Sequence, residues 1–275
     1  CCGRSSPRAC TASIHRVRRR MRSALIGWSG LVGGTLERQT SFTDRYRSSD
    51  IDSIRGRAYD LAVCAGMPAA KWLANKDPER DRQTLQRLWS ALKDARIARL
   101  IVVSTVDVFE QPIGVDERTA VRPEQTSAYG RHRYELERRA SETFDTSVVR
   151  LPAVFGEGLK KNVVYDLLHD NMLHAICPQS VFQFYPLSRL WSDLAVVLSE
   201  QLPLMHLTVE GTSVADVARV AFGRELAPRP DLVPVRYDLR TVHAQRFGSS
   251  ASYLMPAADV LAALHEFVAG ERARV

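Results

Sequence analysis

The stretch ALIGWSGLVGGTL, residues 24–36, decides how the chain is interpreted. A short apolar run ends at a cluster of glycines, and an apolar segment compatible with a helix follows directly. Glycines at the exit of a strand allow a tight turn, and they also let the backbone approach a pyrophosphate. The amino terminus of the following helix would then stabilise the phosphate charge. On its own, the pattern fits either a simple turn or a phosphate-binding loop.

The composition is that of an ordinary globular protein. With 275 residues, 45% hydrophobic and 25% charged, the chain can form one large domain or a domain with a smaller lobe. No apolar run reaches the length of about 18 residues that a membrane span needs, so we expect no membrane partner. The cysteines and histidines lack zinc-site spacing, so we expect no metal. Few cysteines favour a reduced, cytoplasmic location.

The net charge of +7 is confined to the amino terminus. Residues 1–22 contain seven arginines and no acidic residue, so the remaining chain is neutral overall. We expect residues 1–20 to be a disordered basic tail. Translated upstream sequence is the simplest origin, and a transit peptide or a nucleic-acid-binding arm are the alternatives. Nucleic-acid binding is therefore not expected of the rest of the chain.

Strand-like and helix-like segments alternate along the chain. Helical spacing or composition predicts helices, and β-branched apolar runs predict buried strands. The helices are expected within residues 31–39, 77–98 and 127–143. The strands are expected in the apolar run that ends at Gly27 and within 42–46, 59–66 and 98–109, with a further strand followed by a loop in 146–158. This alternation predicts a parallel sheet with crossover helices, in which ligands bind at the carboxyl ends of the strands.

Four candidate ligand-binding segments fall at that one edge of the predicted sheet. They are the glycine cluster, Ala65-Gly66, Ser104-Thr105 and residues 152–158. Because they come from four different parts of the sequence, their agreement favours the phosphate-binding interpretation of the glycines over a simple turn.

These segments resemble the extended short-chain dehydrogenase/reductase family, which includes nucleotide-sugar epimerases and dTDP-4-dehydrorhamnose reductase. GWSGLVGG (27–34) is similar to the family's G-x-x-G-x-x-G, and VSTVDVFE (103–110) to the strand with the active-site Ser or Thr. SAYGRHRYELE (127–137) resembles the Y-G-x-S-K helix, and RLPAVFGEG (150–158) the segment R-L-x-N-V-Y-G-P-G. The resemblance runs from Met21 to about Gly158 and continues weakly beyond.

The resemblance implies an α/β fold, a Rossmann-type doubly wound parallel sheet with a smaller C-terminal substrate lobe. The coenzyme-binding domain, for NADP or NAD, would consist of residues 21–158 together with about 181–205. The substrate lobe would consist of residues 159–180 and 206–275. A homodimer is possible in this family. The implied coenzyme-binding residues are Gly27, Gly30, Leu31, Val32, Gly33, Arg47, Ala65, Gly66, Ser104, Tyr129, Arg133, Leu151 and Pro152.

The resemblance also implies the catalytic residues Thr105, Tyr129 and Arg133. A tyrosine phenol, with an ordinary pKa of about 10, needs a nearby cation to exchange protons at neutral pH. The family uses a lysine four residues after the tyrosine, and this chain has Arg133 there. Arginine keeps the charge but relays no proton. Arg133→Lys is therefore expected to be tolerated. Three interpretations of this departure remain open: a working variant site, a slow enzyme, and a dinucleotide-binding protein that has lost catalysis.

The implied substrate ligands are Lys160, Lys161, Asn162 and Arg189. Val106-Asp107 follows Thr105, where family dehydratases carry Asp-Glu, which argues against dehydration. We therefore expect an NAD(P)-dependent reductase or epimerase acting on a nucleotide-linked sugar or a similar carbonyl or carbinol substrate. The alternative is a catalytically impaired NAD(P)-binding regulatory or sensor protein.

The choice between the two coenzymes depends on the end of the second strand. The segment RYRSSD (45–50) places Arg47 where a ribose-binding acid is otherwise expected. A guanidinium suits a 2′-phosphate, so we expect NADP rather than NAD. Asp44 and Asp50 remain alternatives as the ribose acid.

Overall fold

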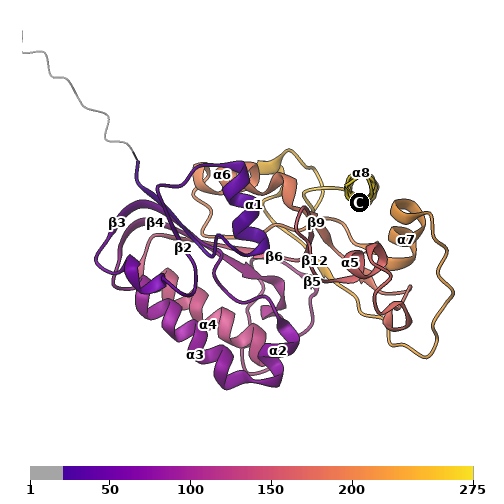
Figure 1. Cartoon of the computed structure of the whole chain (residues 1–275), viewed down its shortest axis with the longest axis horizontal. Coiled ribbons are helices and arrows are strands. Elements are labelled where there is room, and N and C mark those ends of the chain that lie inside the picture. The colour runs from indigo at the N-terminus through magenta and orange to yellow at the C-terminus, as the bar shows by residue number, and fades with distance from the viewer. Residues whose placement is uncertain (1–20, 275) are drawn as a thin grey trace, which may run out of the picture.

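Six parallel strands form the central sheet of the computed structural model, which describes residues 21–274. The predicted tail, residues 1–20, lies outside the described residues. The connections from β1 and β3 run to opposite sides of the sheet, so the glycine turn after β1 lies at the switch point (Figure 1). The strand order is β2 (Asp44–Tyr46), β1 (Ser23–Ile26), β3 (Ala58–Cys64), β4 (Arg96–Thr105), β6 (Thr146–Leu151) and β10 (Leu204–His206).

Both faces of this sheet are covered by helices. The central strands are apolar on both sides: Leu61 and Val63 of β3 enter one core cluster, while Ala62 and Cys64 enter the other. Helices α1 (Leu31–Gln39) and α6 (Leu190–Ser199) pack on one face, and α3 (Pro78–Leu92) and α4 (Ala128–Thr143) on the other. The predicted doubly wound α/β fold is confirmed.

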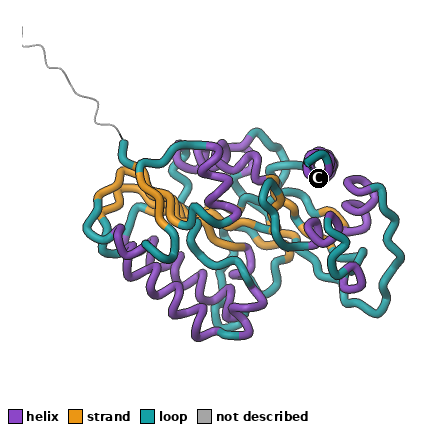
Figure 2. Tube along the Cα trace, viewed as in Figure 1, coloured by secondary structure: helices purple, strands orange, loops and turns teal. Residues whose placement is uncertain are grey.

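The C-terminal part lies beside the carboxyl edge of the sheet (Figures 1 and 2). Its core is continuous with the core under α1 and α6, so the two parts share one apolar cluster. The C-terminal part contains helices α5 (Val163–Leu168), α7 (Val214–Phe222) and α8 (Ala257–Arg272). Three strand pairs complete it: β5 (Ile113–Val115) with β12 (Asp238–Leu239), β7 (Ala153–Phe155) with β9 (Phe184–Pro186), and β8 (Val181–Phe182) with β11 (Thr212–Ser213).

Several element boundaries differ from the sequence prediction. The helix expected over residues 77–98 ends at Leu92, because β4 begins at Arg96 and pairs with β3 from there. The strand expected to reach residue 109 ends at Thr105, whose side chain accepts a hydrogen bond from Asp107 and starts a short 3₁₀ turn. A helix that the sequence did not predict, α2 (Lys71–Lys76), follows β3. Among the described residues, no helix has the length and apolarity that a membrane crossing requires.

Candidate active site

The glycine turn after β1 is closed by backbone packing at two of its glycines. A Cβ on Gly27 would lie 2.5 Å from the carbonyl oxygen of Ala65, and one on Gly33 would lie 2.0 Å from the carbonyl oxygen of Gly27. Gly27 also has a positive φ of 86°, which side chains disfavour. At Gly30 the nearest atom to an added Cβ is 3.4 Å away. The fold itself therefore leaves room for a small side chain at Gly30, in ordinary contact with the Gly27 carbonyl.

Helix α1 begins directly after this glycine. Gly30 is its N-cap residue, no side chain caps the first turn, and no acidic residue lies in that turn. Helix N-termini with free N–H groups favour anions. The turn thus combines a close backbone approach with a helix terminus that suits a phosphate.

A cavity of about 130 Å³ lies at the carboxyl edge of the sheet, next to α1 and α4. Eight residues that the sequence analysis proposed line it, and they come from five separate segments. The full lining consists of Val32, Ala65, Met67, Ala69, Val103, Ser104, Thr105, Tyr129, Arg133, Leu151, Pro152 and Val154. The structure thus brings the predicted catalytic residues and much of the predicted coenzyme site together.

Tyr129 lies near the start of α4, where its side chain is 7% exposed. Burial raises the pKa of its phenol above the ordinary value, while the Arg133 guanidinium and the Thr105 hydroxyl lower it. The carboxylate of Asp107 raises it further. The protonated phenol is therefore the favoured form, and a phenolate at this position would need additional positive charge.

Arg133 is 1% exposed and is held by four hydrogen bonds. Its Nη1 donates to Asp81 Oδ2 (2.6 Å) and to the Tyr129 carbonyl (3.1 Å). Its Nη2 donates to Asp81 Oδ1 (2.9 Å) and to the Pro68 carbonyl (2.5 Å). The guanidinium carbon lies 3.8 Å from the centre of the Tyr129 ring. Arg133 thus faces the aromatic ring of Tyr129 while its charge is paired with a carboxylate.

Asp81, on α3, is the residue that sequence reasoning missed. Its carboxylate accepts hydrogen bonds from both terminal nitrogens of Arg133, Nη1 and Nη2. It is also hydrogen-bonded to His132 Nδ1 at 2.8 Å. Burial raises the pKa of Asp81, but the hydrogen bonds from Arg133 and His132 hold it below its ordinary value overall. No motif marks this residue, because it lies 52 positions from Arg133 on a different helix.

One N–H of Arg133 has no partner. Its Nε is buried and makes no hydrogen bond to any residue that the structure describes. An unpaired buried donor costs free energy, on the order of 1–3 kcal/mol, unless a ligand or water accepts from it. Arg133 lines the cavity, but this nitrogen has almost no exposed surface, so a ligand oxygen reaches it only if neighbouring side chains move.

A second polar group lies beside Tyr129. Asp107 accepts hydrogen bonds from Lys71 Nζ (2.8 Å) and from the Tyr237 hydroxyl (2.9 Å). Burial, Asp107 and the nearby Tyr129 raise the pKa of Tyr237 above its ordinary value. These contacts join α2 and the C-terminal segment to the turn after β4, and no sequence spacing pointed to them.

The remaining predicted residues lie around the cavity at differing positions. Arg47 follows β2, and its guanidinium lies over the ring of Trp28 in the glycine turn, 5.8 Å from the ring centre. Lys161 donates a hydrogen bond to the carbonyl of Ala69, at the cavity wall. Arg189 does not line the cavity, because it is paired with Asp193 at 3.2 Å.

Two other predicted residues have defined positions. Asn162 caps α5 through its side chain, which accepts from Val164 N and Tyr165 N. Asp44, an alternative ribose acid, accepts from the Tyr59 hydroxyl (2.7 Å) and from Arg22 (2.9 Å). These contacts occupy Asp44 away from the glycine turn.

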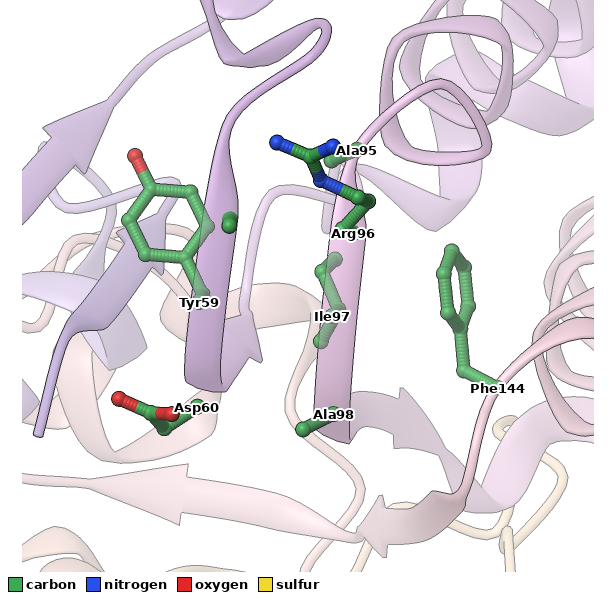
Figure 3. Close-up of a pocket in the computed structure, with 8 residues that line it drawn as sticks. Tyr59, Asp60, Ala95, Arg96, Ile97, Ala98 and Phe144 are labelled. Atoms are coloured by element: carbon green, nitrogen blue, oxygen red, sulfur yellow. The ribbon is translucent and has the colours of Figure 1, made fainter.

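A larger cavity, of about 450 Å³, lies at the opposite edge of the sheet (Figure 3). Tyr59 and Asp60 from β3 and Arg96 from β4 surround it, together with Phe144. These residues are at the amino ends of the strands. Open parallel sheets bind their ligands at the carboxyl ends, so the smaller cavity is the candidate site.

Comparison with solved structures places the chain in a known fold. The chain has the fold of the extended short-chain dehydrogenases/reductases. Neither the search of family models nor the search of curated proteins by sequence finds a match. The likeness is thus one of structure.

Three solved structures illustrate the likeness. UDP-glucose 4-epimerase from Thermotoga maritima with UDP-glucose is 14% identical, with a TM-score of 0.72 over 92% of this chain and 99% of that one. RMD from Pseudomonas aeruginosa with NADPH is 18% identical, with a TM-score of 0.72 over 93% and 100%. The dTDP-4-dehydrorhamnose reductase from Bacillus anthracis with NADP is 15% identical, with a TM-score of 0.69 over 91% and 99%.

Proposed function

We propose that this protein is an NADP-dependent reductase or epimerase that acts on a carbonyl or carbinol carbon of a nucleotide-linked sugar or a similar substrate. One observation carries the proposal: the phenol of Tyr129 and the hydroxyl of Thr105 line one cavity with Val32, in the first turn of the helix that follows Gly30. The arrangement supports a proton-transfer pair next to a phosphate-binding turn. The solved neighbours contain NAD in some cases and NADP or NADPH in others, which supports a nicotinamide dinucleotide without choosing between the two.

The residues present fit a dinucleotide coenzyme. The room at Gly30 and the uncapped start of α1 suit its pyrophosphate, and the unpaired Nε of Arg133 suits an oxygen of its ribose once neighbouring side chains move. Arg47, beside Trp28, suits a 2′-phosphate. When bound, NADP accepts a hydride from a carbinol carbon or supplies one to a carbonyl carbon.

The chain's own residues then manage the proton and the orientation. Thr105 holds the substrate oxygen beside Tyr129, and the phenol oxygen exchanges a proton with it. In reduction Tyr129 gives its proton to the oxygen, and in oxidation it takes one. The apolar wall of Val103, Leu151 and Val154 keeps water from the reacting oxygen.

The substrate is proposed to bind between the two parts of the chain. Residues 21–158 with 181–205 would hold the coenzyme, and 159–180 with 206–275 would form the substrate lobe. Lys160, Lys161 and Asn162, next to the cavity, are the proposed contacts to a diphosphate. Arg189 is the weaker candidate, because Asp193 already occupies its guanidinium. A homodimer is part of this proposal, and sedimentation of the purified chain tests it.

The direct test measures coenzyme binding and turnover. Titration with NADPH, followed by its fluorescence, is expected to show saturable binding, and a panel of nucleotide sugars is expected to include a substrate that oxidises bound NADPH or changes configuration. A chain that binds neither NADPH nor NADH contradicts the proposal.

A second candidate is an NADP-binding regulatory or sensor protein without turnover. The ion pair between Arg133 and Asp81 favours it, because the pKa of the phenol stays above its ordinary value although Arg133 lowers it. Tight coenzyme binding with no turnover over the whole panel would select this candidate.

A further inference from the structure

Lys161 contacts a residue of the cavity wall from a distant part of the chain. It lies between β7 and α5, and its Nζ donates to the carbonyl of Ala69, 92 positions away in the loop after β3. Ala69 lines the cavity together with Tyr129 and Arg133. The ammonium group therefore lies at the wall of the site that holds the proposed acid–base phenol.

The charges around the cavity leave Lys161 without a carboxylate. Arg133 is paired with Asp81, and Lys71 is paired with Asp107. For Lys161 no carboxylate lies within ion-pair distance among residues 21–274, and a neutral carbonyl accepts from it instead. Of these three cations next to the cavity, Lys161 carries the charge that remains free.

The position of Lys161 is electrostatically unfavourable as it stands. Arg133 Nη2 and Lys161 Nζ donate to successive carbonyls, those of Pro68 and Ala69, so two cations lie near each other. Burial and the Arg133 charge lower the pKa of Lys161 below its ordinary value. A negative charge in the cavity would relieve both effects.

The backbone next to Lys161 is strained and firmly held. Asn162 has a φ of 99°, a region that residues other than glycine rarely adopt. Its amide nitrogen donates to the Val154 carbonyl (2.9 Å), and its amide oxygen accepts from Val164 N (3.0 Å) and Tyr165 N (3.3 Å). Such a strained backbone conformation persists where the surrounding contacts enforce it. Here the hydrogen bonds of the Asn162 side chain hold the backbone next to Lys161 in place.

The residue type is also informative. Of the 38 basic residues only five are lysines, namely Lys71, Lys76, Lys93, Lys160 and Lys161. A chain that otherwise uses arginine has lysine at this position. Lysine is a compact charge on a flexible stem, so it can move between two acceptors, whereas the planar guanidinium favours one fixed set of hydrogen bonds.

We propose that Lys161 is the free cation of this active site and that its ammonium leaves the Ala69 carbonyl to stabilise the phenolate form of Tyr129. The inference rests on the proposed function, in which Tyr129 exchanges the proton of the substrate oxygen. It moves the role that the sequence analysis gave to Arg133 onto Lys161, in place of the diphosphate contact proposed above for this residue, which stays with Lys160.

The surroundings of Tyr129 explain why such a cation is needed. The groups that face it are Arg133 on α4, Asp81 on α3, Asp107 after β4, and Tyr237 from the C-terminal segment. Burial raises the pKa of the phenol, and Arg133 lowers it. Asp107, although it is paired with Lys71, and Asp81 raise it again, so the pKa stays above its ordinary value. A sphere of 130 Å³ is about 6 Å across, the range over which one charge shifts a neighbouring pKa. An ammonium group entering this cavity therefore lies within reach of the phenol oxygen.

The proton balance is closed. In oxidation, Tyr129 first releases its phenol proton to solvent, and the phenolate then takes the substrate O–H proton as the hydride passes from the carbon that bears this oxygen to oxidised NADP. The neutral phenol is thereby restored, and the one proton released to solvent is the proton that the overall oxidation produces. Lys161 keeps all its protons and returns to the Ala69 carbonyl. In reduction, the same groups act in the reverse order, and Lys161 stabilises the phenolate that the donated proton leaves behind.

The test is an ultraviolet difference titration of tyrosinate in the full chain, with and without NADP. The Tyr129→Phe variant identifies the step that belongs to Tyr129. Lys161→Met is expected to raise the midpoint of that step by about one pH unit or more in the NADP complex, since it removes a charge at close range. Lys161→Arg is expected to restore part of the shift, and Lys93→Met, at the exposed end of α3, to leave it unchanged.

Three further outcomes test the role of Lys161. A Tyr129 midpoint in Lys161→Met equal to that of the wild type, with NADP still bound, would overturn the role of Lys161 while the proposed function stands. Failure of every form to bind NADP would overturn the proposed function and this inference with it. Lys161→Gln, which keeps a hydrogen-bond donor without the charge, is expected to behave like the Met variant, and a wild-type midpoint in that variant would count against the charge.

Discussion

Arg133 and Asp81 form a two-point ion pair between α4 and α3, with N–O distances of 2.6 and 2.9 Å. The pair is buried, and Arg133 also holds the carbonyls of Tyr129 and Pro68. Because the carboxylate neutralises the guanidinium, Arg133 joins the two helices and the loop after β3 rather than offering a free charge. The departure from the family lysine is thus accompanied by a matching acid on a neighbouring helix.

This geometry gives Arg133→Lys a different expected outcome from the one that the sequence alone suggested. An ammonium group cannot make the two-point contact with Asp81 and still reach Pro68. We expect a loss of about 1–3 kcal/mol in the free energy of unfolding for Arg133→Lys and about 3–5 kcal/mol for Arg133→Met, which leaves Asp81 buried without its partner. Urea denaturation measures both. Arg138→Lys, at an exposed pair with Glu142, is the control and should change little.

Gly30→Val should abolish coenzyme binding while the fold is retained. The room beside Gly30 admits a small side chain, but that side chain would occupy the place of the pyrophosphate. Gly33→Ala should instead destabilise the fold, since its Cβ would meet the Gly27 carbonyl. NADPH titration and urea denaturation of both variants separate the two effects. Unchanged NADPH affinity in Gly30→Val would show that the turn does not hold the coenzyme.

Arg47→Gln should weaken NADP binding by about 10–100-fold and leave NAD binding nearly unchanged. The guanidinium over Trp28 is the proposed partner of the 2′-phosphate, and charge-assisted hydrogen bonds of this kind contribute about 1.5–3 kcal/mol. Arg45→Gln, which loses a nearby charge that is paired with Glu37, serves as the control. Binding isotherms for both coenzymes decide the matter. A wild-type chain that binds NAD more tightly than NADP would argue against Arg47 in this role.

Tyr129→Phe should lower turnover by roughly 10²–10⁴ while coenzyme binding persists, because only the proton-transferring oxygen is removed. Steady-state assays with the identified substrate measure the first effect, and NADPH titration measures the second. Tyr134→Phe, one turn further along α4, is the matched control and should retain activity. A fully active Tyr129→Phe enzyme would exclude this phenol as the acid–base group.

His206 should make the fold sensitive to acid. It is fully buried at the end of β10, where burial lowers its pKa from 6.5 to about 4. Between these values the folded protein keeps His206 neutral while the unfolded chain takes up a proton, so stability falls as the pH falls. The loss is about 3 kcal/mol between pH 6.5 and 4.

Urea denaturation at pH 7 and near pH 4.5 measures this loss. His206→Gln should lose less stability than the wild type over the same interval, since the titrating group is gone. Equal losses in the two proteins would assign the acid sensitivity to other groups.

Much of the fold followed from local pattern. The apolar run and glycines at residues 24–36 predicted β1, the turn and α1, and the structure has α1 at the expected residues, Leu31–Gln39. Strand ends were less well predicted, because β4 stops where the side chain of Thr105 starts a 3₁₀ turn, which apolar character does not show. Helix α2 was missed because its six residues carry no clear apolar period.

The candidate site likewise contains residues that the sequence could predict and contacts that it could not. Thr105, Tyr129 and the glycines lie in contiguous motifs, so the family resemblance of these motifs and the carboxyl ends of the predicted parallel strands were enough to expect them at one edge. The pairing of Asp81 with Arg133 joins residues 52 positions apart, and the contact of Lys161 with Ala69 joins residues 92 apart. Such contacts depend on how the helices and the lobe pack against each other. The sequence around Asp81 or Lys161 therefore does not show which residue each of them contacts.

The two edges of the central sheet are both short. Strands β2 and β10 have three residues each, and charged side chains lie on and next to β2. A short, charged edge offers little backbone for another strand to pair with, which protects a protein from edge-to-edge aggregation. Association of this chain with copies of itself must therefore use helix or lobe surfaces. The central sheet is thereby protected against pairing with strands of another molecule.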